Sequence, residues 1–315
     1  MIYRVRPIKK LLLSSLLSFS LVLPSAHLSL AYAETLSGPA SSSISDRLAQ
    51  VTEQRNKAES TPNVTAAAAY TVEPDAQGQT RIRVSGSGSK ITLANVRTGI
   101  GAANAALLQN LGNGIWQLNA NLFIDTGVTL NLGAQSGSSE LRMRSEAVVQ
   151  AAGATATRTV IEPDGQQRVL AIDYSSFVYL TTYDGVINMD GIKVTSWDPD
   201  TGTVDTDYEN GRAYILAKYD AVLNIRNSDI GYLGSADGES YGVSWRDVNA
   251  TATPDVLRNR VTGEVLNSKF HHLYYGIYTF QASNMTFRGN QFYQNIKYGF
   301  DPHDYTHDVL VEDNI

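Results

Sequence analysis

The stretch YGIYTFQASNMTFRGNQF, residues 275–292, is followed by a second copy of its pattern, YGFDPHDYTHDVLVEDNI, at residues 298–315. The two copies align at one constant offset, which superimposes Tyr275 on Tyr298 and places Leu310 on Phe287. A repeat of this length is too short for an independent domain, so each copy needs a neighbour to bury its apolar face.

Earlier parts of the chain carry weaker copies. Phe270 precedes Phe292 by one position less than this offset, and a further Tyr-Gly pair occurs at Tyr241. Looser copies are GVINMDGIKVTSW (185–197) and AVLNIRNSDI (221–230), with longer insertions between them. Short β-type runs alternate with Gly, Asn, Asp and Ser, and no long helical pattern intervenes.

A period of about 22–24 residues made of strands and turns predicts a solenoid whose coils stack at about 4.8 Å. Leucine-rich repeats share the period, but their L-x-x-L-x-L consensus is absent, and a β-sandwich would not explain the constant offset. We therefore predict an all-β fold, a right-handed parallel β-helix over residues 66–315. Because Ile315 falls in the middle of a coil and no capping pattern follows, we expect this solenoid to be incomplete at its C-terminal end.

The first residues resemble an export signal. Four basic side chains precede an apolar run from Leu11 to Leu23, and Ala31-Tyr32-Ala33 offers a small-residue cleavage site. The run is shorter than the roughly 20 residues of a membrane-spanning helix, and serines interrupt it. We predict a signal peptide at residues 1–33 cleaved after Ala33, a low-complexity extension at 34–65, and a periplasmic or secreted protein without a transmembrane segment after cleavage.

Charge and cysteine content restrict the class of function. Removal of residues 1–33 leaves 21 basic side chains (25 less four) against 31 acidic ones, a net charge of −10. This balance argues against a nucleic-acid-binding role, because phosphate binding needs positive charge. The absence of cysteine excludes disulfides and thiolate chemistry.

The segment Asp301-Pro302-His303-Asp304 interrupts the repeat. In the alignment His303 replaces Phe280, Asp301 replaces Tyr278, and Asp304 replaces a glutamine, so coil positions are exchanged for titratable ones. Strand alternation puts Asp301 and His303 on one face, next to Tyr278 and Phe280 of the preceding coil, an aromatic pair suited to stacking against sugars. A polar turn with one satisfied histidine is the alternative. Two acids that flank the histidine favour a site that acts on a polysaccharide.

From about residue 185 to 315 the chain resembles the periplasmic mannuronan C5-epimerases of alginate biosynthesis. The resemblance rests on KVTSW (193–197), NSDIGYLGSADGESYGVS (227–244), LYYGIYTFQAS (273–283) and above all NIKYGFDPHDYTHDVLVEDN (295–314). It implies an isomerase that converts mannuronate to guluronate in the polymer by inverting C5, and an anionic uronate polysaccharide, polymannuronate or alginate, as the partner. Other polysaccharide-export proteins are further expected partners.

The resemblance also implies roles for single residues. His303 matches the base that removes H5, and imidazole titrates near neutral pH. Asp301 and Asp304 would orient the imidazole or bind sugar hydroxyls, and we expect Tyr298, Tyr278 and His307 to bind substrate. The same column holds tyrosines at 241 and 275, so Tyr298 can equally be a repeated structural aromatic. In these enzymes a carboxylate-neutralising arginine lies on the coil after DPHD, which here would begin beyond Ile315.

Two other functions remain open at this point. A polyuronate lyase would use the same carbanion to expel the 4-O-linked sugar, and a non-catalytic β-helix would bind the polysaccharide during export. Neither a metal nor a cofactor is predicted, because no convincing metal spacing and no acidic nonapeptide calcium repeat occurs.

Overall fold

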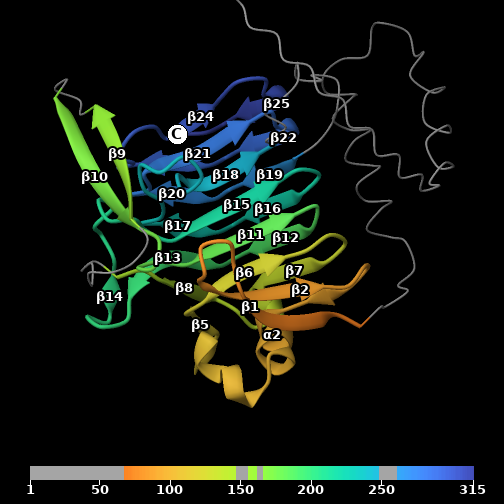
Figure 1. Ribbon diagram of the computed structural model, residues 1–315. Coiled ribbons are helices and arrows are strands. Elements are labelled where there is room, and N and C mark those ends of the chain that lie inside the picture. The colour runs from red at the N-terminus through yellow and green to blue at the C-terminus, as the bar shows by residue number, and fades with distance from the viewer. Residues whose placement is uncertain (1–66, 147–154, 162–165, 248–260) are drawn as a thin grey trace, which may run out of the picture.

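Strands from successive coils stack into three sheets in the computed structural model (Figure 1), which describes residues 67–146, 155–161, 166–247 and 261–315. The predicted signal peptide and the whole of the predicted extension lie outside the described residues. Within each sheet the neighbours are in sequence order, and the chain passes from sheet A to sheet B to sheet C before it returns. This path is that of a β-solenoid, as the repeat predicted.

Sheet A consists, in spatial order, of β1 (Ala69–Pro74), β2 (Thr80–Ser85), β6 (Asn121–Ile124), β11 (Tyr179–Tyr183), β15 (Tyr214–Lys218), β18 (Gly242–Arg246), β21 (Tyr275–Phe280) and β24 (Phe300–Pro302). Sheet B consists of β3 (Lys90–Ile91), β7 (Thr129–Gly133), β12 (Val186–Asp190), β16 (Val222–Arg226), β19 (Gly263–Leu266), β22 (Ser283–Arg288) and β25 (His307–Glu312). Sheet C consists of β4 (Leu108–Gly112), β5 (Ile115–Leu118), β8 (Glu140–Arg144), β13 (Lys193–Asp198), β17 (Asp229–Gly231), β20 (Lys269–His271) and β23 (Gln291–Tyr293).

Strand pairing is parallel from coil to coil. The antiparallel exceptions at the stack are β1 with β2, β4 with β5, and the short β14 (Thr203–Val204) with β13. The pairs Phe270–Phe292 and Ile277–Phe300 confirm the spacings read from the repeat on sheets C and A. The constant offset is wrong for sheet B, where Phe287 pairs with Val311 instead of Leu310, because one extra residue lies in the turn after β24.

A column of apolar side chains fills the interior of the solenoid. Leu122, Leu180, Ile215 and Val243 pair in register along sheet A, and each is fully buried. Burial on one side of each strand follows from the alternation of side chains, and coil-to-coil stacking removes this surface from water. On sheet B a ladder of asparagine amides runs from Asn131 through 188 to 224, with N···O distances of 3.0 and 2.9 Å.

The corner between sheets B and C repeats a left-handed backbone conformation. Gly191, Asn227, Asn267, Gly289 and Asp313 occupy this corner in successive coils, with φ between 50° and 69°. Glycine and asparagine adopt positive φ at the lowest cost, which explains why these residue types punctuate the repeat. The turn residues therefore close each coil at the same place.

Short helices and one hairpin depart from the coil pattern. The helix α2 (Leu93–Gly99), capped by Thr92, and the 3₁₀ helix η1 (Ala102–Leu107) lie at the orange end of the stack in Figure 1. A second short 3₁₀ helix, η2 (Ala134–Ser136), follows β7. The antiparallel hairpin of β9 (Thr155–Ile161) and β10 (Gln167–Asp173) stands out from the stack, and the carbonyl of Ile161 accepts a hydrogen bond from Lys297 Nζ at 2.8 Å.

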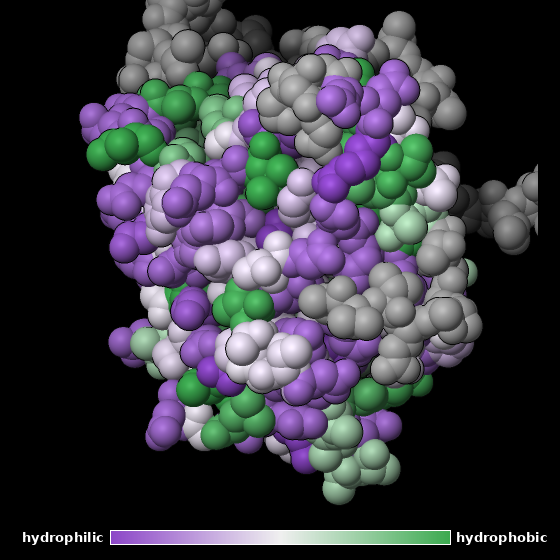
Figure 2. Space-filling model, turned by 90° about the vertical axis from the view of Figure 1, so that its left-hand side faces the viewer, coloured by the Kyte–Doolittle hydropathy of each residue, from purple (hydrophilic) through white to green (hydrophobic). Residues whose placement is uncertain are grey.

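The hairpin therefore runs alongside the coils towards β24. The face that carries it is mostly hydrophilic, with apolar residues scattered rather than gathered (Figure 2). Within the described ranges, no helix has both the length and the apolar character to cross a membrane.

Candidate active site on the outer face of sheet A

Strand alternation decides which residues of the last two coils face outward. In β21, Ile277 and Thr279 are fully buried in the solenoid, which leaves Tyr278 and Phe280 on the outer face. In β24, Phe300 packs against the core and Asp301 pairs in register with Tyr278. Asp301 and His303 therefore share the outer face, as the repeat alignment predicted.

Main-chain hydrogen bonds hold the DPHD segment to the preceding coil. The amide of His303 donates to the carbonyl oxygen of Thr279 at 2.8 Å, and the carbonyl oxygen of Asp304 accepts from the amide of Gln281 at 2.9 Å. The side chains of His303 and Asp304 are both exposed. The backbone is thus fixed while the titratable groups remain open to a ligand.

The imidazole of His303 lies beside two aromatic rings. Its centroid is 5.5 Å from that of Tyr278 and 6.2 Å from that of Phe280. No other described residue forms a hydrogen bond to this imidazole, so a ring nitrogen can accept a proton from a ligand. Tyr278 is itself only 6% exposed, which leaves Phe280 as the more accessible apolar surface.

Burial and the neighbouring histidine both affect the pKa of Asp301. Burial raises the pKa of Asp301 above its usual value, and the positive charge of protonated His303 opposes this shift. The carboxylate and the imidazole are therefore close enough to interact electrostatically.

An arginine that sequence reasoning did not assign to the site lies on the same face. The guanidinium of Arg246, at the end of β18, is 5.4 Å from the ring centre of Tyr278 and 6.0 Å from that of Phe280. It also donates a hydrogen bond to the carbonyl of Gly238. Burial raises the pKa of Tyr278 to about 12, and the charge of Arg246 opposes this rise.

The repeat held a signal for this residue. Arg246, Phe280 and His303 each lie five positions after the tyrosine of a Tyr-Gly pair. Arg246 pairs in register with Phe280, so the three positions form one column across β18, β21 and the end of β24. A guanidinium, an aromatic ring and an imidazole thus follow one another along the face.

Tyr298 ends a stack of tyrosines. The ring of Tyr275 lies 4.5 Å from that of Tyr241 and 5.4 Å from that of Tyr298. The repeated aromatic column expected from the sequence is present. Tyr298 is 57% exposed at its end, so its ring is accessible.

His307 belongs to another sheet. It begins β25, pairs in register with the buried Ser283, and places Nδ1 3.0 Å from the carboxylate of Asp308. The structure thus brings His303, Asp301 and Tyr278 together, and it places His307 beyond the turn that leaves this face.

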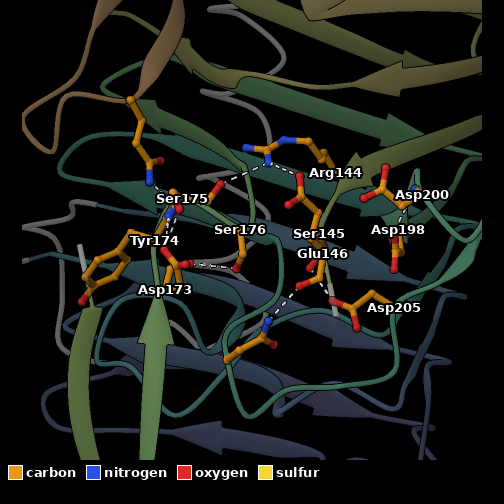
Figure 3. A network of polar contacts seen from close by, with 12 residues as sticks. Arg144, Ser145, Glu146, Asp173, Tyr174, Ser175, Ser176, Asp198, Asp200 and Asp205 are labelled. Carbon is orange, nitrogen blue, oxygen red and sulfur yellow. Dashed lines mark hydrogen bonds and ion pairs between the residues drawn. The ribbon is translucent and has the colours of Figure 1, made fainter. Parts of the chain in front are cut away.

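Acidic residues also gather where the insertions join sheet C (Figure 3). Asp205 is buried and accepts a 2.6 Å hydrogen bond from Ser145, and Arg144 bonds to Glu146 and to the carbonyl of Ser175. Burial raises the pKa of Asp205 to about 6, although the Ser145 hydroxyl favours the charged form. These side chains are engaged with one another, and within the described part of the chain no group of three acids or histidines is arranged to hold a metal ion.

Comparison with known proteins yields relatives of one kind. No protein-family model matches the chain. A mannuronan C5-epimerase of Pseudomonas fluorescens is 27% identical over 157 residues, 49% of this chain and 30% of that protein. The mannuronan C5-epimerase AlgG of Azotobacter vinelandii is 27% identical over 134 residues, 42% of this chain and 25% of that protein.

The solved structures extend the likeness of fold. The crystal structure of the periplasmic alginate epimerase AlgG aligns with a TM-score of 0.62 at 15% identity, over 89% of this chain and 62% of that one. A point mutant of it aligns with a TM-score of 0.61 over 82% of this chain and 58% of that one. The chain thus spans about 30% of the length of the first curated relative and under two thirds of the solved one. The resemblance to the mannuronan C5-epimerases that the DPHD segment carries is confirmed, over about half of the chain in sequence and most of it in fold.

Proposed function

We propose that this chain carries the catalytic base of a mannuronan C5-epimerase, an isomerase that converts β-D-mannuronate to α-L-guluronate within an anionic uronate polymer. The observation that carries the proposal is the position of His303, exposed beside Asp301 and the rings of Tyr278 and Phe280, in a segment that resembles the DPHD segment of such enzymes. The proposal is supported by the similarity of this chain to curated proteins that are named mannuronan C5-epimerases.

The proposed reaction begins when a nitrogen of His303 removes H5. The electron pair left on C5 is delocalised into the adjacent carboxylate. An acid or a water molecule then donates a proton to C5 from the opposite face, which inverts the centre without cutting the chain. Asp301 and Asp304 orient the imidazole or accept hydrogen bonds from sugar hydroxyls. Tyr298, Tyr278 and, from the start of sheet B, His307 complete the proposed substrate contacts.

H5 is a weak acid until the neighbouring carboxylate is neutralised, so the reaction needs a cation or hydrogen-bond donors at that carboxylate. Among the described residues Arg246 has the best position, because its guanidinium lies over the same two rings as His303. Arg288, which is also close to the DPHD segment in sequence, lies on sheet B and pairs with Glu312 at 2.8 Å. We propose that Arg246 contacts the uronate carboxylate, either of the reacting sugar or of its neighbour.

We also propose that the solenoid winds to the right and that it forms one domain over residues 66–315. Right-handed connections between parallel strands are overwhelmingly preferred, because strand twist favours them. A cleaved signal at 1–33 and an extension at 34–65 complete the proposed organisation, with a periplasmic or secreted location. The solved AlgG relative is described as periplasmic, which agrees with this location.

The test is incubation of the full chain with polymannuronate in D₂O. An epimerase introduces deuterium at C5 and guluronate signals in the NMR spectrum without shortening the polymer. Unsaturated ends that absorb in the ultraviolet would instead identify a lyase, and binding without either product would identify a polysaccharide-binding scaffold. Retention of exchange in His303→Ala would remove His303 as the base.

A further inference from the structure

A cavity of about 360 Å³ lies on the outer face of sheet A, away from the DPHD segment. Its floor is formed by Tyr179 of β11 and Tyr214 of β15, which pair in register. The β1–β2 turn forms one wall, and the residues around the β9–β10 hairpin form another. The remaining lining residues are Asp75, Gln77, Gln79, Arg158, Tyr174, Phe177, Asp237, Gly238 and Glu239.

Aromatic rings supply much of this surface. The ring of Phe177 lies 6.1 Å from that of Tyr174 and 6.2 Å from that of Tyr214, which in turn lies 5.6 Å from Tyr179. Such rings offer apolar faces at little entropic cost, and a pocket built from rings and a few polar groups is typical of small-molecule sites. The C–H faces of a pyranose fit this surface.

Each acid in the lining already has a donor from the protein. Asp237 accepts from Tyr174 Oη at 2.7 Å and from Arg158 Nε at 2.6 Å. Asp75 accepts from Tyr179 Oη at 3.1 Å, and Glu239 from Lys218 at 2.6 Å. Their charges are therefore partly balanced, while each carboxylate keeps lone pairs that can accept hydroxyl protons from a ligand.

A ligand carboxylate would find no free cation among the described residues of this lining. Arg158 is the one cation among the described residues that line the cavity, and it is engaged with Asp237. A uronate would have to lose its water beside three acids without a free cation, which is costly. The same acidic surroundings are visible at Tyr174, where burial and the bond to Asp237 raise the pKa to about 12.

We propose that this cavity binds a neutral pyranose. Its floor reaches β15, three strands from β24 along sheet A, which corresponds to about 14 Å. This placement makes the cavity a second saccharide site on sheet A, separate from the uronate site proposed at His303.

Isothermal titration of the full chain with β-1,4-mannobiose tests the proposal, with the β-1,4-linked mannuronate disaccharide as the charged counterpart. Mannobiose should bind, and the mannuronate disaccharide should not displace it. Tyr174→Ala should weaken mannobiose binding about tenfold, the loss of one aromatic contact. Tyr293→Ala is the matched control, because Tyr293 is 41% exposed on sheet C, and it should bind like the parent.

Absence of mannobiose binding, its displacement by the mannuronate disaccharide, or parental affinity in Tyr174→Ala would each overturn the proposal. If Tyr174→Ala does not fold, Asp237→Asn replaces it, since it removes an acceptor and keeps the size of the side chain. His303→Ala should keep the parental affinity for mannobiose while it loses H5 exchange. Mannobiose binding in a chain without any exchange would uphold the cavity and reject the epimerase.

Discussion

Two histidine sites on different sheets have opposite chemical character. On sheet C, His271 places Nε2 2.8 Å from Asp229 and Nδ1 2.9 Å from His272, so both of its nitrogens are occupied. On sheet A, the imidazole of His303 has no hydrogen bond from any other described residue, and it lies against aromatic rings.

The surroundings of the sheet C pair reinforce this difference. His272 stacks on Tyr232 at 4.5 Å and His271 on Tyr293 at 5.1 Å. Burial, with His271 and Arg212 nearby, lowers the pKa of His272. A base must keep a nitrogen for the substrate, so proximity of an acid to a histidine does not by itself define an active site. The comparison predicts that His303 on sheet A is catalytic and that His271 and His272 on sheet C have a structural role.

The largest expected effect separates the two sites by the same substitution. His303→Gln should lower the rate of H5 exchange by about 10²- to 10⁴-fold, because it removes the general base, whereas His271→Gln should leave the rate within about twofold. NMR exchange in D₂O with polymannuronate measures both. Equal losses in the two variants would break the comparison.

The next effect tests whether the sheet A face also supplies the cation. Arg246→Gln should lower exchange by about 10- to 100-fold, because the developing charge on the carboxylate loses its partner. A fall in kcat would indicate that Arg246 contacts the reacting sugar. A rise in KM would indicate that it contacts a neighbouring sugar. Arg288→Gln on sheet B is the control, and an equal loss there would point to a general effect of charge.

A third test extends the comparison to carboxylates. Asp205 has a pKa near 6 in the folded state against 3.8 for an unperturbed side chain. The folded protein therefore holds the extra proton between about pH 4 and 6, and the free energy of unfolding falls as pH rises through this window. Asp205→Asn should remove about 1–2 kcal/mol of that fall, less than the full shift implies because buried sites relax. Urea denaturation at pH 4 and pH 7 measures it, and an unchanged pH dependence would contradict it.

The smallest effect concerns stability at the two histidines. His271→Gln should lower the free energy of unfolding by about 1 kcal/mol, since it disturbs a half-buried hydrogen-bonded pair. His303→Gln should change it by less than about 0.5 kcal/mol, because the side chain is exposed. Thermal denaturation of both variants provides the values, and a larger loss for His303→Gln would assign it a structural role.

Much of the fold was predictable because the same residue pattern, and so the same packing, recurs in several coils. Phe270 and Phe292 pair and stack as their spacing predicted, and Asp301 and His303 share the outer face. The register of β25 departs from the constant offset, because a single extra residue in a turn shifts a strand by one position without leaving a mark in composition. The hairpin β9–β10 is an insertion, and no period places it.

By itself, the sequence determined the coil period, the direction in which side chains alternate, and the DPHD departure from the pattern, since all three depend on neighbours along the chain or one coil away. Only the tertiary structure decided that His271 has both nitrogens occupied, and that Asp237 and Glu239 line a cavity with tyrosines of β11 and β15. These contacts join segments separated by insertions of unequal length, so their partners are set by how the coils and the hairpin pack in space.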